Sequence, residues 1–373
     1  MIRTIRVQDV VPFYASIWRA RGFVPPLEVD FKPTLQCNLK CKMCFQRKLS
    51  EQEKKKAIEE ELPTERYYTL IDELVHMGTR RIHIVGGGEP LLRNDILSIM
   101  RRVKEYNLEG VLTTNGIALN SQKIHELIQL NWDLVMFSVD GPNAEIYEDV
   151  RGVPGAFNKL VSAIRGLSQA RAEKHQTKPL IQMHCVIMNK NYMALENMVE
   201  LGHQVGADIV TFIKCQPQDP SLLVRNKDLP ETFRHLKEAF RKAVKYGIAT
   251  NAAEEILNWS KKPKDVICFR PWISPDIWHN GNVTPCCYSE DVMGNIRNTS
   301  FREVWDGEKF NKLRKMFFQG KFPDFCKNCN EYDLLLETVP LSRWLHKTKT
   351  LITLPNFSRK HQYVSMSEMD KIC

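Results

Sequence analysis

The sequence predicts an α/β fold: a parallel sheet built from six βα units, followed by a small, loop-rich region. Three observations support this fold class. The chain has 373 residues, of which 43% are hydrophobic, enough for a large apolar core. From Leu27 to about Phe240, short β-type runs alternate with runs of helical period. Beyond Lys261 this alternation gives way to short segments rich in Cys, Trp, Pro, Asn and Gly.

Six strands and six helices can be placed in order along the first part of the chain. Parallel strands carry their functional loops at their carboxyl ends, whether the sheet is open or curled into a barrel, so chemistry is expected directly after each strand. The strands are expected at residues 27–34, 81–85, 110–113, 134–139, 181–187 and 209–213. The helices are expected at residues 65–77, 95–106, 122–129, 157–170, 192–204 and 230–245.

The same patterns predict five segments. The mixed-charge run 51–61 reads as a solvated helix or loop within the core. The small second domain contains too few residues to depend on apolar packing alone. The expected segments are an N-terminal extension (1–26), the core (27–250), a linker (251–265), the cysteine-rich domain (266–332) and a C-terminal tail (333–373).

Composition excludes several classes of protein. The longest apolar stretch without charge, Pro179 to Asn189, is too short to cross a bilayer. Arg3, Arg6 and Asp9 interrupt any signal-peptide core, which predicts a cytoplasmic protein. The net charge of +9 is diluted along the chain and favours anionic small molecules or acidic surfaces, and no nucleic-acid partner is expected. With no export signal, the 11 cysteines are expected to be metal ligands or reduced thiols.

The first candidate metal site follows the first strand. Cys37, Cys41 and Cys44 form a C-x3-C-x2-C cluster. Three thiolates close to one metal centre leave one coordination position open, whereas a structural zinc site uses four ligands. A cubane iron-sulfur cluster with one unligated iron suits this set. The alternative is a zinc knuckle completed by a distant Cys or His.

Polar residues also follow the second, third and fourth strands. Consecutive glycines would let backbone approach a ligand closely, and carboxylates at the carboxyl edge of the sheet would face the same mouth as the cysteines. Each motif alone could be ordinary turn chemistry. The residues concerned are Gly86, Gly87, Gly88 and Glu89, then Asn115, then Ser138 and Asp140, with Arg151 shortly after.

With these motifs, the segment from Leu27 to Lys245 resembles the radical S-adenosylmethionine (SAM) enzymes. The resemblance implies a partial (β/α)6 barrel and a [4Fe-4S] cluster on the three cysteines, whose unique iron binds SAM. Reductive cleavage of SAM would yield a 5′-deoxyadenosyl radical that abstracts hydrogen from a substrate. It also implies roles for individual residues. Glu89 would accept from the methionine ammonium, Ser138 and Asp140 would lie near the ribose and methionyl part, Arg151 would pair with the carboxylate, and Asn115 would be a neighbour.

The residue before the third cysteine is usually aromatic in that family and packs near the adenine. Here it is Met43, followed after the cysteine by Phe45. A thioether can pack against a purine, so the role is expected to persist. The glycines Gly87 and Gly88 belong to the same expected cofactor-binding set.

A second candidate metal site lies in the small domain. Cys268, Cys286, Cys326 and Cys329 supply four thiolates, with Cys287 as the alternative to Cys286. A zinc ribbon is possible on spacing alone. The stretch resembles the SPASM extension of radical SAM enzymes in a shortened form, which implies one auxiliary [4Fe-4S] cluster. Because four thiolates close its coordination shell, we expect it to relay electrons rather than bind substrate.

The expected reaction is an oxidation, by dehydrogenation or crosslinking, with a reducing partner such as flavodoxin or ferredoxin. An epimerase with a thiol hydrogen donor is the alternative, and Cys215 at the end of the sixth strand is the candidate donor, unless it is merely a packed cysteine. Only about thirty residues precede the first strand, which favours a small polar metabolite, such as a sugar or aminocyclitol, over a ribosomal peptide or protein. A non-catalytic iron-sulfur or zinc module is a distant alternative.

Overall fold

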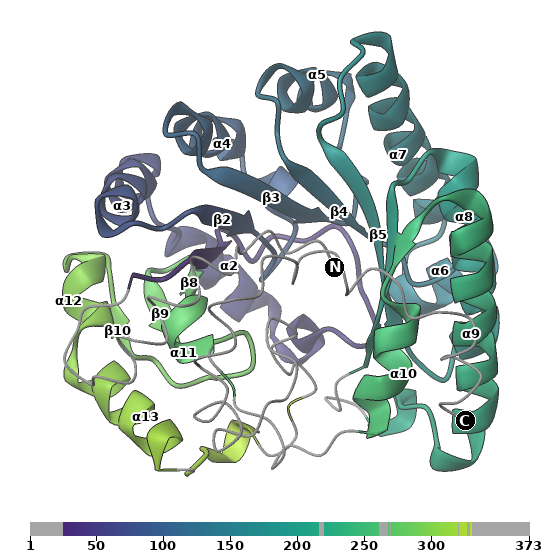
Figure 1. Ribbon diagram of the computed structural model, residues 1–373. Helices are drawn as coiled ribbons and strands as arrows, with labels where there is room; N and C mark the ends of the chain where they lie inside the picture. Colours follow the sequence, from purple (N-terminus) through teal and green to yellow (C-terminus); the bar gives the residue numbers. More distant parts are fainter. Residues whose placement is uncertain are drawn as a thin grey trace, which may run out of the picture.

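The computed structural model describes residues 25–215, 220–260, 268, 270–319, 321–326 and 329. In this part of the chain the strands form one sheet in the order β10-β9-β8-β1-β2-β3-β4-β5-β6-β7. Neighbours from β1 to β7 pair in parallel, and the sheet curves without closing, as Figure 1 shows. The predicted partial barrel is therefore confirmed. Its strands are β1 (Glu28–Lys32), β2 (Arg81–Ile84), β3 (Glu109–Thr114), β4 (Leu134–Ser138), β5 (Leu180–Ile187), β6 (Ile209–Lys214) and β7 (Ala249–Thr250).

Six long helices cover the outer, convex side of this sheet (Figure 1). Their ends follow local sequence signals. The Asn120 side chain caps one helix by accepting from the amide of Lys123 at 3.0 Å, and Gly78 ends another with a φ of 99°. The helices are α3 (Thr64–Met77), α4 (Ile96–Glu105), α5 (Ser121–Gln129), α7 (Ala156–Glu173), α8 (Leu195–Val205) and α9 (Leu229–Tyr246).

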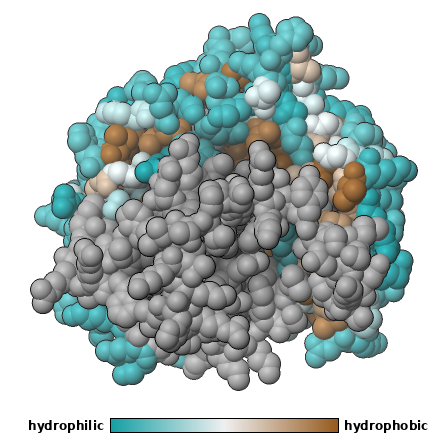
Figure 2. Space-filling model, viewed as in Figure 1, coloured by the Kyte–Doolittle hydropathy of each residue, from teal (hydrophilic) through white to brown (hydrophobic). Residues whose placement is uncertain are grey.

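The two faces of the sheet differ in polarity. On β1, Val29 and Phe31 are fully buried, and the Phe31 ring lies 5.5 Å from the Tyr67 ring of α3. Alternate residues must therefore face the concave side. There Asp30 contacts His83, whose other ring nitrogen lies 2.8 Å from the Thr113 hydroxyl. The concave face is thus polar, whereas the convex face is the apolar core. The described surface seen in Figure 2 is mostly hydrophilic, with scattered hydrophobic patches.

Three further helices occur within the core. The run expected as a solvated helix or loop forms α2 (Glu51–Glu59), which begins with a capping box between Ser50 and Glu53. Helix α6 (Ala144–Arg151) ends at the candidate residue Arg151. Helix α10 (Ala252–Ser260) lies in the stretch expected as a linker.

The expected linker packs against the core at its described end. Asn251 pairs with the backbone of Phe212 on β6 through both its amide oxygen and its amide nitrogen, at 2.8 Å each. The Glu255 carboxylate accepts from the amide of Lys214 at 2.9 Å. This part of the segment therefore belongs structurally to the barrel.

The cysteine-rich region extends the core sheet. Strand β8 pairs in parallel with β1, opposing Asp276 to Asp30, and Lys32 and Asp276 form a buried ion pair across this seam. Phe301, Trp305 and Phe310 supply an apolar centre, with the first two rings stacked at 5.8 Å. The elements are α11 (Arg270–Ile273), β8 (Asp276–Trp278), β9 (Asn282–Thr284), β10 (Gly294–Asn295), α12 (Phe301–Trp305) and α13 (Glu308–Phe318).

The expected N-terminal extension, up to residue 24, and the expected C-terminal tail lie outside the described residues. Among the helices that are described, none has the length and apolar character that crossing a bilayer requires.

Candidate active site

The three-cysteine loop follows β1 at the carboxyl edge of the sheet. Cys41 is buried and Cys44 is half-buried, and the amide of Cys44 donates to the carbonyl of Cys41 at 3.1 Å. Cys37 is exposed as a residue, yet partial desolvation of its thiol raises the pKa to about 11, and the neighbouring Cys41, Glu89 and Cys44 add to this rise. Burial and Cys41 also raise the pKa of Cys44. The three thiols are therefore near enough to influence one another electrostatically.

The glycine run after β2 holds the chain that leads into this loop. The amide of Gly88 donates to the carbonyl of Thr34 at 2.8 Å, and the amide of Glu89 donates to that of Gln36 at 2.7 Å. A Cβ atom on Gly88 would lie 2.1 Å from the Gln36 oxygen. The side-chain amide of Gln46 donates to the carbonyl of Leu35 at 3.0 Å. The glycine run thus packs its backbone directly against residues 34–36, the segment that leads into the cysteine loop.

Replacing Gly88 by alanine should prevent assembly of the first metal centre. The added methyl group cannot fit beside backbone, so the entry to the cysteine loop must shift. We expect anaerobically reconstituted Gly88→Ala protein to lose the iron and sulfide of that centre. Gly155→Ala is the matched control, because a Cβ there has no neighbour within 4 Å although its φ is 75°. Wild-type iron content in Gly88→Ala would contradict this role.

Glu89 is a buried carboxylate with three of its acceptor positions occupied. Its Oε1 accepts from the Thr114 hydroxyl at 2.6 Å and from the amide of Leu91 at 3.1 Å, and its Oε2 accepts from the amide of Asn115 at 2.7 Å. Burial raises its pKa, while these hydrogen bonds lower it. Since two carboxylate oxygens accept about four hydrogen bonds, Oε2 keeps one position for a further donor. That position fits an ammonium group.

Asn115 connects the third strand to the cysteine loop. Its side-chain nitrogen donates to the Asn38 side chain at 2.7 Å, and its side-chain oxygen accepts from the amide of Ile117 at 3.0 Å. Asn38 directly follows Cys37. Asn115 therefore positions the loop, and its side chain is already engaged on both polar atoms.

Ser138 and Asp140 follow the same edge of the sheet at β4. Ser138 ends the strand and is half-buried. Asp140 is fully buried, its Oδ1 accepts from the amide of Val186 at 2.8 Å, and its Oδ2 lies 2.6 Å from Arg151 Nη2. Although burial lowers it, Asp140 and Cys41 raise the pKa of Arg151 above its usual value. The Asp140 side chain thus faces the guanidinium group and the strand backbone.

Met43 and Phe45 lie on opposite sides of Cys44 and have different neighbours. Met43 packs against a small apolar cluster, whereas the Phe45 ring approaches the Trp278 ring at 6.1 Å, edge to face. Cys215 belongs to the apolar cluster that Met43 contacts and is only 3% exposed. The structure therefore places the candidate hydrogen donor in apolar packing beside the cysteine loop.

The cysteines of the second site come from separate segments: Cys268 precedes α11, Cys286 follows β9, and Cys326 and Cys329 follow α13. Gly281, with a φ of 89°, lies in the turn that precedes β9, and Cys286 follows that strand. Burial raises the pKa of Cys286 to about 11. Burial, together with nearby Cys329, raises the pKa of Cys326 to about 12. Cys286 is half-buried whereas Cys287 is exposed. This burial favours Cys286 as the ligand.

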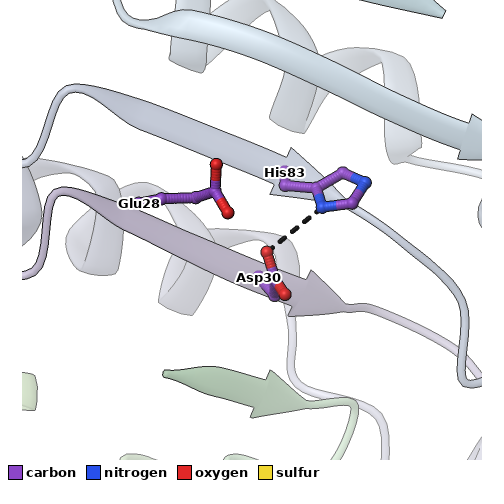
Figure 3. A group of neighbouring side chains, drawn as sticks. All are labelled: Glu28, Asp30 and His83. Atoms are coloured by element: carbon purple, nitrogen blue, oxygen red, sulfur yellow. Dashed lines mark hydrogen bonds and ion pairs between the residues drawn. The ribbon is translucent and has the colours of Figure 1, made fainter. Parts of the chain in front are cut away.

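A separate group on the concave face consists of Glu28, Asp30 and His83 (Figure 3). Their candidate ligand atoms lie within 4.8 Å of one another. However, Arg81 contacts Glu28 at 3.0 Å and Arg270 lies 3.8 Å from Asp30. Two guanidinium groups compensate the carboxylates and oppose a further cation, so the group is part of an ion-pair network.

Several residues that shape the site were not predicted from the sequence. Thr114 and Asn38 bond to Glu89 and Asn115, and the motif Thr-Thr-Asn-Gly offered a signal for Thr114. Asn191 donates to the Asp140 carbonyl at 3.0 Å, and no local pattern marks it. Trp278 reaches the first loop from the cysteine-rich region and could be found only from the fold.

Comparison with known proteins agrees with this geometry. The family model of the Radical SAM superfamily matches residues 31–201, and that of the SPASM iron-sulfur cluster-binding domain matches residues 268–330. The chain is 26% identical over 317 residues to the AdoMet-dependent heme synthase of Methanosarcina barkeri, covering 78% of this chain and 85% of the relative. It is 24% identical over 326 residues to the PqqA peptide cyclase of Granulibacter bethesdensis, covering 83% and 81%. SuiB of Streptococcus suis shares the fold, with a TM-score of 0.63 at 16% identity over 82% of this chain and 70% of SuiB.

An open parallel barrel with three thiols and one available carboxylate position at its mouth fits an iron-sulfur site with an open coordination position. Residues 31–201 form a radical SAM domain, and residues 268–330 form a SPASM iron-sulfur cluster-binding domain. The radical SAM domain binds SAM and a [4Fe-4S] cluster, and the SPASM domain adds a further iron-sulfur cluster. Both zinc alternatives are therefore set aside.

Proposed function

We propose that this enzyme oxidises a peptide or protein substrate by radical chemistry. The family relationship supports hydrogen abstraction, and the relatives shift the expected substrate. The matched relatives include PqqA peptide cyclases, and SuiB was solved with its precursor peptide SuiA. These names favour a peptide over the sugar or aminocyclitol expected from the short N-terminal segment.

The observation that carries the proposal is the convergence of three thiols, Glu89 and Arg151 at one edge of the sheet. Cys37, Cys41 and Cys44 would hold the cluster, and Oε2 of Glu89 would accept from the ammonium group of SAM. When bound, the cluster and SAM supply a 5′-deoxyadenosyl radical. Met43 and Phe45, which flank Cys44, would be the apolar side chains near the adenine, and Ser138 ends β4 at the same edge of the sheet.

The second set of thiols supports oxidation over the other fates of a substrate radical. The auxiliary cluster would have a closed coordination shell of four thiolates, from Cys268, Cys286, Cys326 and Cys329. It would therefore accept an electron and would not bind the substrate. Trp278 lies between the two regions, because it contacts Phe45 and donates to the Thr284 hydroxyl at 3.1 Å. Thr284 in turn donates to the carbonyl of Cys286 at 3.3 Å. Packed residues thus connect the two loops.

Radical epimerisation would need a hydrogen donor, and Cys215 is the candidate. Because Cys215 lies in an apolar cluster, we expect Cys215→Ala to form the same product with the same stereochemistry. The lost packing should cost about 1 kcal/mol of stability. Chiral analysis of the product together with thermal unfolding tests this. Loss of product, or a changed stereocentre, with folding intact would make Cys215 a hydrogen donor.

A tetrapyrrole is the second candidate substrate. It is favoured by the AdoMet-dependent heme synthases among the relatives, which match about as much of the chain as the peptide cyclases do. The proposed oxidation needs the same two clusters in either case. The two candidates can be distinguished by incubating the enzyme with each kind of substrate separately.

Two assays test the proposal in sequence. Anaerobically reconstituted protein, reduced with dithionite or with flavodoxin or ferredoxin, should convert SAM to 5′-deoxyadenosine and methionine. It should then be incubated with short peptides encoded near its gene and, separately, with iron-containing tetrapyrroles. A peptide lighter by two hydrogen atoms supports the main proposal, and a changed tetrapyrrole supports the second. Failure to form 5′-deoxyadenosine from cluster-loaded protein would overturn both.

A further inference from the structure

The last turn of α6 holds the central cysteine of the first loop by its backbone. The amide of Lys40 donates to the carbonyl of Arg151 at 3.0 Å, and the amide of Lys42 donates to that of Val150 at 2.9 Å. These bonds lie on both sides of Cys41. Backbone hydrogen bonds alone therefore hold the segment that carries Cys41 against the end of α6.

The side chain of Arg151 reaches the sulfur of the same cysteine. Its Nη1 donates to Cys41 Sγ at 3.5 Å, while Nη2 lies 2.6 Å from Asp140 Oδ2. Asp140 is fully buried and is itself held by the amide of Val186 at 2.8 Å. Arg151 is only 8% exposed, so solvent screens the contact between its guanidinium group and Cys41 weakly. A chain of contacts therefore runs from the Val186 amide through Asp140 and Arg151 to the sulfur of Cys41, a proposed cluster ligand.

One donor of Arg151 remains available. Its Nε is buried and has no hydrogen-bond partner within the described part of the chain. A buried donor of a charged group is costly to leave unpaired, which indicates an anionic acceptor at this position. The bound cluster or the SAM carboxylate supplies such an acceptor. The contact of Nη1 with Cys41 is therefore compatible with the role that family resemblance gives to Arg151.

We propose that Arg151 is a positioning residue that raises the reduction potential of the SAM-binding cluster through its charged hydrogen bond to Cys41. This rests on the proposed function only in that the first site holds a [4Fe-4S] cluster. One-electron reduction adds negative charge to the cluster and its thiolates. A guanidinium group on a ligand sulfur stabilises the reduced form more than the oxidised form. Asp140 fixes the guanidinium in place.

The test measures the midpoint potential of this cluster by a redox titration followed by electron paramagnetic resonance. The signal of the SAM-binding cluster is recognised because it changes when SAM is added. In Arg151→Gln we expect the ratio of reduced to oxidised cluster at a fixed potential to fall about tenfold or more, which equals a shift of about 59 mV to lower potential. Arg151→Lys should shift it in the same direction by less.

Lys42→Met is the matched control, because it removes a positive charge from the same loop without removing a contact to sulfur. Lys42 Nζ pairs with Asp149, and its side chain is 32% exposed. The midpoint potential of the SAM-binding cluster in Lys42→Met should equal that of the wild type. An unchanged potential in Arg151→Gln with full iron content would overturn the proposal, as would an equal shift in Lys42→Met. If Arg151→Gln does not retain iron, the potential of Arg151→Lys decides in the same way.

This result is independent of the substrate. A shifted potential in the Arg151 variants supports the role of Arg151 even if no peptide is converted. Wild-type protein that holds no cluster, or forms no 5′-deoxyadenosine, would instead remove the proposed function. The two failures are therefore distinguishable.

Discussion

Replacing Cys41 by serine should reduce 5′-deoxyadenosine formation to background, whereas replacing Cys326 by alanine should leave SAM cleavage measurable and remove the oxidised product. The reason is that the two thiol sets have different roles. Cys41 is buried and is contacted by Arg151, and its replacement removes one of the three thiolates proposed to hold the SAM-binding cluster. Cys326 belongs to the closed set, which is proposed to take an electron after substrate has reacted.

The Cys286 and Cys287 pair supplies the control for this experiment. Cys287 is exposed and Cys286 is half-buried, so Cys287→Ala should keep full iron content and Cys286→Ala should lose the auxiliary cluster. Iron and sulfide analysis, 5′-deoxyadenosine measured by chromatography, and product mass are the three readouts. Full product from Cys326→Ala would show that the second cluster has no redox role. Loss of SAM cleavage in the same variant, with the first cluster intact, would show that the two sites are not separable.

The barrel was predictable from the sequence because its signals are local and repeated. Each strand from β1 to β6 and each long helix lies within a few residues of its expected position. The hydrophobic period alternates along the chain, and these elements carry caps or glycines at several of their ends. Helices α6 and α10 were not predicted because they occupy stretches expected as loop and linker. Helix α6 adds a second helix between β4 and β5, and α10 follows the two-residue strand β7, which is too short to give a sequence signal.

The candidate site was predictable to the extent that it follows strand ends. The three cysteines, Glu89 and Asn115 were found because parallel strands bring their carboxyl ends together. What the side chains contact could not be inferred in this way. The positions of Glu89 between Thr114 and Asn115, and of Arg151 between Asp140 and Cys41, depend on side-chain directions that a linear pattern does not contain.

The connection between the two cluster-binding regions was the least predictable feature. Composition indicated a separate domain, whereas β8 pairs directly with β1 and continues the core sheet. The strands lie far apart in the sequence, and β8 is only three residues long, so no periodicity reveals the pairing. The Lys32–Asp276 ion pair runs diagonally across this seam, since Asp276 opposes Asp30 and Lys32 opposes Trp278, and it favours this register.

Replacing Lys32 by methionine should therefore destabilise the protein by about 3–5 kcal/mol, because it leaves the fully buried Asp276 without its ion-pair partner. Lys32 also stacks on Trp278, with Nζ 4.1 Å from the ring centre, so the loss should loosen the seam between β1 and β8. Thermal unfolding and limited proteolysis of the anaerobic protein would measure both effects. The double variant Lys32→Met/Asp276→Leu should recover most of the stability, since an apolar pair replaces an ionic one. Lys54→Met, which removes an exposed ion pair with Glu51, should change stability by less than about 0.5 kcal/mol.

The loss in Lys32→Met should also depend on pH in a defined direction. Burial raises the pKa of Asp276 to about 6 even though Lys32 lowers it, and removing Lys32 should raise it further. A carboxyl group whose folded pKa lies above its unfolded value favours the folded state while protonated, and this contribution is lost as the pH rises through the folded pKa. The difference in stability between Lys32→Met and the wild type should thus be small at pH 5 and grow above about pH 6, where Asp276 of the wild type has lost its proton. A difference that is large and constant from pH 5 to pH 8 would mean that Lys32 acts through its packing on Trp278 and not through its charge.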